Sequence, residues 1–285
     1  GASGALYAVG AAITNMWSNN VPGVQAASQA SAGGIANLNM VSDGEAQVSI
    51  AISSNVYQCL NGTDSFKDHP YKDLKAIAGL YMNPNQVVVT AKSGIQTLAD
   101  VKGKRFAVAS AGSSVYNESN AHFTAAGLKF PDDIQAEYIT FTDAADMLQN
   151  GSIDGAWIMS GAPASAVTQA LTGGARLVDI DDQLVKELKA KYPWYASYTI
   201  KAGTYPNQDR DVRTTAVKMV MFTRGDMPED VVYNLTKALW EHIDELGQAQ
   251  KNLKGLKPED AVKDIANVPL HRGAEKYYRE IGVLK

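Results

Sequence analysis

Small polar residues recur wherever a predicted strand gives way to a predicted helix. These junctions fall at residues 1–4, 31–34, 53–55, 110–114 and 160–163, and they are mainly serine, glycine and alanine. In an open α/β sheet the carboxyl ends of parallel strands share one edge, and ligands bind there. Each junction would offer backbone N–H groups, the positive end of a helix dipole and hydroxyl groups. Such a set of groups can hold a carboxylate without lysine or arginine.

Two interpretations of these junctions remain open. Serine and glycine also cap helices, and capping alone accounts for any single junction. The recurrence of the pattern at one predicted sheet edge favours a small-molecule site. A phosphate site is disfavoured, because the chain has neither a GxxxxGK[ST] nor a GxGxxG motif.

The distribution of charge supports a site of this kind. The 285 residues carry a net charge of −4, with 45% hydrophobic and 20% charged residues, which is a globular composition. Residues 1–66 contain no lysine, arginine or histidine. The chain has no basic tail or stripe, so we expect no nucleic-acid partner. An anion bound by the first segment would be held by backbone and hydroxyl groups.

Residue patterns typical of catalysis are weak. The four histidines, His69, His122, His242 and His271, lack metal-ligand spacing, and Cys59 is the single cysteine. Ser113 or Ser114 with His122 as base would be a nucleophilic pair, but no GxSxG motif surrounds them. We therefore expect no catalytic residue, no metal and no cofactor.

Targeting and membrane segments leave the compartment open. The uncharged stretches 1–42 and 155–175 are interrupted by polar residues, so we expect neither to span a membrane. No basic segment precedes an apolar run near residue 1. The sequence therefore predicts either a cytosolic protein or one from which a signal peptide has been removed.

Helical and strand patterns alternate along the chain. We expect helices at 6–17, 34–41, 118–126, 142–149, 164–171, 183–191, 229–246, 258–265 and 272–281. We expect strands at 24–29, 48–52, 76–80, 87–91, 106–109, 136–140, 156–159, 177–180 and 217–223. Alternation at this spacing predicts α/β layers with largely parallel sheets.

Two segments look like crossings between domains. Residues 81–91 interrupt two apolar runs with an Asn-Pro-Asn turn, and residues 191–213 are rich in proline, glycine and tyrosine. The predicted organisation is a first α/β lobe of 1–89 plus 218–285, a second of 90–217, and a ligand cleft between them. Two crossings are typical of hinge closure around a ligand. The aromatic residues at 192–205 either line this cleft or pack as a loop.

Several short motifs follow one another in a specific order. They are Gln29-Ala30-Ser31 with Gly33-Gly34, Ser42-Asp43-Gly44-Glu45-Ala46, Tyr57 with Asn61-Gly62, 98–105, Gly112-Ser113, Ala126-Gly127-Leu128, 191–195, 202–209, Val268-Pro269-Leu270-His271, Gly273-Ala274 and Tyr277-Tyr278. In this order and spacing the chain resembles the TAXI-type solute-binding proteins of tripartite ATP-independent periplasmic (TRAP) transporters. The resemblance covers essentially the whole chain.

The resemblance implies a bilobed periplasmic-binding-protein fold, type II-like, in a periplasmic protein. We expect the protein to be a monomer. It implies a receptor, without enzymatic activity, that closes over a small carboxylate and delivers it to the integral-membrane TRAP permease subunits. Acidic amino acids such as glutamate, or dicarboxylates such as 2-oxoglutarate, are the expected ligands. The alternatives are a periplasmic sensory binding module, or a hydrolase or isomerase on the same fold.

The resemblance also assigns ligand-binding positions. They are Ser3, Gly4, Tyr7, Ser31, Ser53, Ser54, Asn55, Tyr81, Ser113, Ser114, Ser160 and Gly161. Three features depart from the family. The chain begins inside the first glycine-rich junction, Gly112-Ser113-Ser114-Val115 stands where Gly-Ser-Gly-Thr is frequent, and Lys201 replaces a usual proline. The change at Ser114 and Val115 bears on ligand choice, so the sequence predicts no single ligand.

Overall fold

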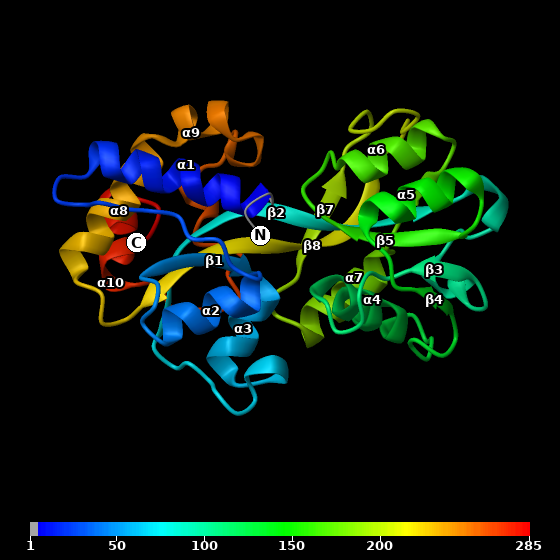
Figure 1. Cartoon of the computed structure of the whole chain (residues 1–285), viewed down its shortest axis with the longest axis horizontal. Coiled ribbons are helices and arrows are strands. Elements are labelled where there is room, and N and C mark those ends of the chain that lie inside the picture. The colour runs from blue at the N-terminus through cyan, green and yellow to red at the C-terminus, as the bar shows by residue number, and fades with distance from the viewer. Residues whose placement is uncertain (1–4) are drawn as a thin grey trace. The chain divides into compact units, whose positions relative to one another are not determined.

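The computed structural model describes residues 5–285, and the chain divides into two compact units (Figure 1). Unit 1 comprises Gly1–Met82 and Lys218–Lys285, and unit 2 comprises Asn83–Val217. Strands β2 (Leu74–Val89) and β8 (Val212–Arg224) each run through both units. The units divide at 82–83 and 217–218, whereas the sequence analysis places the lobe boundaries at 89–90 and 217–218.

Unit 1 contains a small sheet, formed by β1 with parts of β2 and β8, and several helices. It contains α1 (Ala5–Asn20), α2 (Gly34–Ser42), β1 (Val48–Ile52), α3 (Ser53–Asn61), α8 (Glu229–Glu241), α9 (Ile243–Ala249) and α10 (Arg272–Glu280), with 3-10 turns at Asp64–Phe66, Lys251–Leu253 and Pro258–Asp260. Strand β1 pairs antiparallel with β8, with Val48 opposite Thr223 and Ile52 opposite Met219. The carboxyl end of β1 therefore lies where β8 enters unit 1.

Unit 2 alternates strands and helices. It contains 3-10 turns at Ala91–Ser93 and Leu98–Val101, β3 (Arg105–Ala107), α4 (Ser114–Ala125), β4 (Gln135–Glu137), α5 (Phe141–Asn150), β5 (Gly155–Met159), α6 (Ser165–Thr172), β6 (Arg176–Val178), α7 (Asp182–Lys191) and β7 (Ala196–Ile200). The strand order is β1-β8-β2-β5-β3-β4, with β6 on β2 and β7 on β8.

Strand direction corrects one prediction. Strand β3 pairs parallel with β4 and β5, as expected. Strand β2, however, is antiparallel to β5 and β6, and β8 is antiparallel to β1 and β7. The expectation of largely parallel sheets is therefore wrong. The two long strands that pass between units run against their neighbours, and the sequence pattern does not show this.

Most predicted elements are present, but some differ. The predicted strand at 24–29 is irregular backbone, and the predicted helix at 258–265 is only a short 3-10 turn at Pro258–Asp260. The predicted helix 229–246 is interrupted at His242 between α8 and α9, and the predicted strands 76–80 and 87–91 belong to the single strand β2. Helix α3 and strand β7 are missed, since α3 begins with three polar residues that hide its apolar face.

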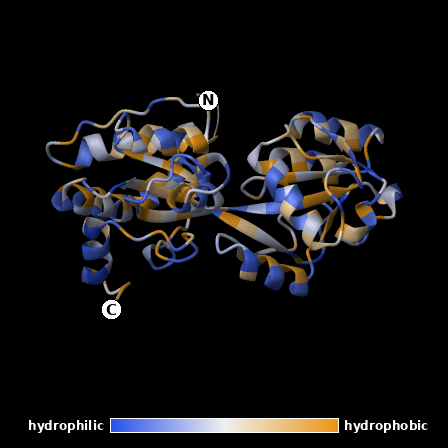
Figure 2. Ribbon diagram, turned by 90° about the horizontal axis from the view of Figure 1, so that it is seen from below, coloured by the Kyte–Doolittle hydropathy of each residue, from blue (hydrophilic) through white to orange (hydrophobic). Residues whose placement is uncertain are grey.

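Each unit has its own hydrophobic core, and Figure 2 shows hydrophobic residues along the central strands of each. In unit 1, Leu38, Val56, Leu74, Val220 and Phe222 belong to one buried cluster. In unit 2, the strand residues Val88, Ala156 and Ile158 pack with residues of α5 and α6. Within residues 5–285, no helix is both long and apolar enough to cross a bilayer.

Candidate functional site

Three helices of unit 2 begin at the same edge of its sheet. Phe106 of β3 lies opposite Ala136 of β4 and Gly155 of β5, and all three strands run in one direction. Helices α4, α5 and α6 follow these strands in turn, so their N-termini share the carboxyl edge. Met159 at the end of β5 lies opposite Asn85 of β2. The edge is therefore at the end of the sheet where β2 enters unit 2.

Ser113 and Ser114 lie at the start of α4. The Ser113 hydroxyl accepts a hydrogen bond from the backbone N–H of Tyr116 at 3.2 Å and caps the helix. Gly112 precedes it with φ of 77°, a left-handed conformation that favours glycine. The capping interpretation is thus correct for Ser113. Its hydroxyl proton is not used by this bond and can still be donated to an anion.

Ser160 and Gly161 lie in the loop between β5 and α6. The Ser160 carbonyl accepts from Gln86 Nε2 at 3.0 Å, and the Tyr205 hydroxyl hydrogen-bonds Gln86 Oε1. The oxygen of Tyr205 also accepts from the Ala164 N–H at 2.9 Å. Helix α5 begins at the same edge, where the Thr140 hydroxyl caps it by accepting from the N–H three residues later. The loop and the start of α6 are thus held by buried polar groups.

The aromatic residues at 192–205 pack mainly within unit 2. Tyr195 and Tyr205 are buried, and Tyr192 lies edge-on to Tyr195 with ring centroids 5.9 Å apart. Burial raises the pKa of Tyr205 to about 12. Of the two interpretations left open above, the packed loop describes Tyr195 and Tyr205.

In unit 1 the N-termini of α2 and α3 lie side by side. A Cβ atom on Gly34 would lie 3.2 Å from the Asn55 side-chain oxygen, so the two helix starts are in near contact. Neither helix has a side-chain cap on its first turn. Gly33 begins α2 with φ of 119°, which a larger residue would adopt only with strain. These two first turns therefore present backbone N–H groups, with no side-chain cap on either helix.

The predicted side chains around these two helices mostly hold the fold. The Ser31 hydroxyl donates to Asn37, whose amide in turn donates to the Ile50 carbonyl at 2.9 Å. Ser53 is fully buried and its hydroxyl accepts from the Lys218 N–H at 3.1 Å. Ser54 and Asn55 are buried as well.

The remaining predicted residues are placed as follows. Ser3 and Gly4 lie outside the described residues. Tyr81 lies within β2 and is buried, and burial raises the pKa of its hydroxyl to about 12. Tyr7 lies on α1, away from the starts of α2 and α3 along the chain, and it lines a pocket of unit 1. Tyr7 and Ser31 line that pocket together, whereas Ser53, Ser54 and Asn55 lie at the start of α3 and are not part of its lining. Ser113, Ser114, Ser160 and Gly161 follow β3 and β5 at one edge of unit 2.

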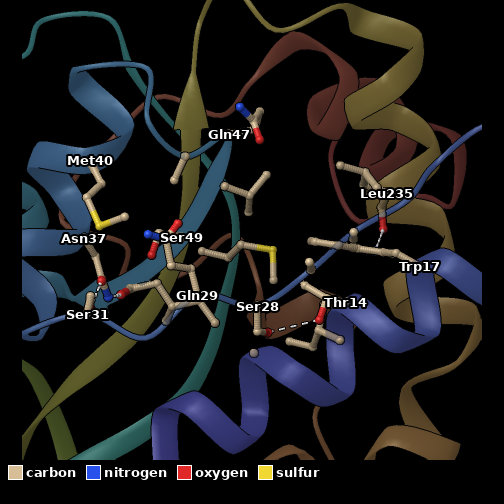
Figure 3. Close-up of a pocket in the computed structure, with 18 of the residues that line it drawn as sticks. Thr14, Trp17, Ser28, Gln29, Ser31, Asn37, Met40, Gln47, Ser49 and Leu235 are labelled. Atoms are coloured by element: carbon tan, nitrogen blue, oxygen red, sulfur yellow. Dashed lines mark hydrogen bonds between the residues drawn. The ribbon is translucent and has the colours of Figure 1, made fainter. Parts of the chain in front are cut away.

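The pocket of unit 1 has a volume of about 460 Å³ and lies among α1, α2, β1 and residues 24–29 (Figure 3). Figure 3 shows Ser31 beside Asn37 on one side and Trp17 beside Leu235 on the other. The lining contains no lysine, arginine or histidine, and its one carboxylate is Glu45. Glu45 is an exposed residue, and Ser31 and Gly33 at the start of α2 belong to the same lining.

The described part of the chain shows no clustered metal ligands and no nucleophile–base pair at the edge. Within residues 5–285, no three His, Cys, Asp or Glu side chains are grouped as a metal site. His122 Nδ1 hydrogen-bonds the Glu118 carbonyl at 2.7 Å, and His122 Nε2 bonds Thr215 at 2.7 Å. Because both ring nitrogens are engaged, His122 does not act on Ser113 or Ser114 in this structure.

Sequence reasoning missed a buried polar network behind α4. Asn85 Nδ2 donates to Glu118 Oε2 and to Thr215 Oγ1, each at 3.0 Å, and Trp157 Nε1 donates to Asn85 Oδ1 at 2.9 Å. Burial raises the pKa of Glu118 to about 7, and hydrogen bonds from Tyr195 and Asn85 act in the opposite direction. The available signal was the spacing of Glu118 and His122, four residues apart on one helix face.

The fold defines the class of protein. Two α/β units crossed by two long strands, with helix N-termini gathered at the strand ends, make up the periplasmic-binding-protein fold, as predicted. The chain belongs to the NMT1-like family, whose model matches residues 1–282.

Solved structures support this assignment of the fold. The structure is similar to MatC from Rhodopseudomonas palustris with bound malate, with a TM-score of 0.55, 14% identity, and coverage of 97% of this chain and 90% of that chain. It is also similar to the periplasmic aliphatic sulphonate binding protein SsuA from Escherichia coli, with a TM-score of 0.52, 18% identity, and coverage of 99% and 91%.

Proposed function

We propose that the protein is an extracytoplasmic solute receptor that captures a small carboxylate by closure of its two units and delivers it to a TRAP membrane permease. Glutamate, a related acidic amino acid, or a dicarboxylate such as 2-oxoglutarate is the first ligand to test. The TAXI resemblance supports delivery to TRAP permease subunits and a periplasmic location, and MatC, which holds malate, has the same fold.

The observation that carries this proposal is the gathering of helix N-termini in each unit. Helices α2 and α3 begin side by side in unit 1 without side-chain caps, and α4, α5 and α6 begin at one sheet edge in unit 2. Backbone N–H groups at a helix start, together with the helix dipole, favour a carboxylate. The sequence of the five starting segments contains no lysine, arginine or histidine.

Among the described residues, Lys218 is the one lysine or arginine that is buried, and its ammonium group is already hydrogen-bonded. The Lys218 ammonium donates to the carbonyl of Asp260 at 2.6 Å and to that of Lys263 at 2.9 Å. Burial lowers the pKa of Lys218, which agrees with its position inside unit 1. Recognition of the carboxylate is therefore assigned to backbone amides and hydroxyl groups.

A thermal-shift screen tests this function. Glutamate, glutamine, 2-oxoglutarate, C4-dicarboxylates and neutral amino acids are added in turn, and any copurified ligand is identified by mass spectrometry. A ligand at about 100 times its Kd should stabilise the folded protein by about 2.7 kcal/mol. A shift with a carboxylate that is recovered unchanged supports the receptor. Chemical conversion of the compound, or the absence of a shift with every carboxylate in the screen, would refute it.

The two alternative functions are separated by different observations. A hydrolase or isomerase would need a reactive pair, and the bonding of His122 to Glu118 and Thr215 argues against the one that the sequence suggested. A sensory module would bind the same ligand. Uptake by reconstituted permease subunits that depends on this protein would support the transport role, and binding without any dependent uptake would favour the sensor.

A further inference from the structure

A pair of tyrosines lies on the surface of unit 2 beside the helix starts of the candidate edge. Tyr138 follows β4 directly, and Tyr116 lies in the first turn of α4. Their ring centroids are 6.3 Å apart, and the ring planes are inclined by 31°. Tyr138 is 50% exposed, and within residues 5–285 only Ile281 is another large apolar side chain with comparable exposure.

The pair is backed by a series of rings that reaches the core. Tyr116 lies edge-on to Phe130 at 4.8 Å between centroids, and Phe130 stacks on Phe123 at 6.1 Å. Phe123 is fully buried, and its ring lies edge-on to that of Phe106 with the two ring centroids 5.2 Å apart. The Tyr116 backbone N–H is also tied to the Ser113 cap. Tyr116 is therefore held in place, and Tyr138 presents its ring to solvent beside it.

The helix starts near the pair carry small polar and apolar residues, and Glu137 at the end of β4 is the charged residue next to Tyr138 in the chain. Residues 108–114, 138–141 and 160–163 contain no charged side chain. Within the described residues, no hydrogen bond engages the hydroxyl of Tyr116 or Tyr138. Aromatic faces of this kind gain most from another flat ring, with ring centroids about 4.5–7 Å apart.

We propose that Tyr116 and Tyr138 form an aromatic subsite that stacks against the planar part of the ligand, so that the preferred ligand is an aromatic monocarboxylate of the benzoate type. This inference rests on the proposed receptor function, because the carboxylate end is assigned to the start of α4. The acid group would lie at Ser113 and Ser114, and the ring against Tyr116, which is one helical turn further along α4, and its neighbour Tyr138.

A protein partner is the other occupant that such a surface suggests. A stable protein interface takes roughly 800 Å² from each partner, far more than two rings provide. The pair is also continuous with the first turn of α4, where the Ser113 cap and Tyr116 are joined by a hydrogen bond. These observations favour a small ring of the ligand.

The test measures binding to the full chain by isothermal titration calorimetry with three probes: benzoate, cyclohexanecarboxylate and glutamate. Benzoate and cyclohexanecarboxylate have similar size and charge, and they differ in the flat ring. The variants are Tyr138→Ala, Tyr138→Phe, which keeps the ring, and Ile281→Ala as the matched control at the other exposed apolar residue. Thermal unfolding of each variant checks that it is folded.

We expect the wild-type protein to bind benzoate about three- to tenfold more tightly than cyclohexanecarboxylate, the range that one aromatic contact supplies. Tyr138→Ala should lose this preference, whereas Tyr138→Phe and Ile281→Ala should keep it.

Four outcomes would contradict the expectation. If folded Tyr138→Ala binds benzoate as tightly as the wild-type protein does, the subsite is overturned. Binding of glutamate without benzoate would overturn the subsite and leave the receptor function intact. Failure of all carboxylates to bind would overturn both. A Tyr138→Ala protein that binds normally but no longer supports permease uptake would identify the pair as a docking surface instead.

Discussion

Replacing Glu118 by glutamine should remove the loss of folding stability that the ionisation of Glu118 causes as pH rises. Glu118 is buried in unit 2, and its side chain receives hydrogen bonds from Asn85 and Tyr195. Burial raises its pKa from 4.5 to about 7. A group whose pKa rises on folding stabilises the protein fully below its unfolded pKa, and that stability is lost as pH rises to the folded pKa. The window for Glu118 is therefore about pH 4.5 to 7.

The magnitude follows from the size of the pKa change. Each pKa unit corresponds to about 1.4 kcal/mol, so the full change is worth about 3 kcal/mol, and most of it falls between pH 5 and pH 8. Glutamine keeps an oxygen that can accept the bond from Asn85, and it never ionises. The free energy of unfolding of Glu118→Gln, relative to wild type, should therefore rise by about 2–3 kcal/mol from pH 5 to pH 8.

The contribution of His122 to folding stability depends on pH in the opposite sense, so it must be separated from the contribution of Glu118. Burial lowers the pKa of His122 to about 4, while its bond to the Glu118 carbonyl acts the other way. Its contribution is present above about pH 6.5 and is lost as pH falls toward 4. Because wild type and Glu118→Gln both contain His122, comparing the two proteins largely removes this term.

The assay is urea unfolding of both proteins at half-unit steps from pH 5 to pH 8, with Glu187→Gln on the exposed face of α7 as the control. The control should follow wild type at every pH. A stability difference between Glu118→Gln and wild type that stays constant across this range would refute the reasoning, because it would mean that Glu118 titrates alike in the folded and unfolded chains.

Three further predictions concern stability within unit 2. Ser113→Ala removes the cap of α4 and should lower the free energy of unfolding by about 1 kcal/mol in chemical denaturation, whereas Ser113→Asp should restore most of it. Gly155→Ala places a Cβ 2.5 Å from the Phe106 ring, so we expect a loss of about 1–3 kcal/mol; an unchanged melting temperature would show that the ring moves freely. Trp157→Phe removes the donor to the Asn85 oxygen inside the core and should cost about 1–3 kcal/mol, with less loss in the Asn85→Leu background, which a double-mutant cycle measures.

The sequence predicted those elements of the fold whose pattern is local. Strands β1 and β5 are short, mainly apolar runs, and polar residues mark the helix starts after them. The antiparallel direction of β2 and β8 was not predictable, because pairing depends on residues far apart in the chain. Residues 24–29 have strand-like composition but no regular pairing in the structure, since a strand needs a neighbour as well as a pattern.

The candidate site was predictable in part for the same reason. Serine and glycine at the junctions pointed to the helix starts, and the structure brings Ser113 and Ser160 to one edge of unit 2. The roles of single side chains were less visible. Ser53 is buried and supports the fold. Nothing in the sequence around Glu118 indicates that its side chain is buried and accepts a hydrogen bond from Asn85.

The most direct test of the central claim is a calorimetric titration of the full chain with carboxylates, each paired with its neutral amide: glutamate with glutamine, succinate with succinamide, and benzoate with benzamide. Helix N-termini and hydroxyl groups should favour the anion, so at least one acid should bind one-to-one, at least about tenfold more tightly than its amide, and be recovered unchanged. Equal binding of acid and amide in every pair, or conversion of the bound acid, would contradict the account of a carboxylate receptor.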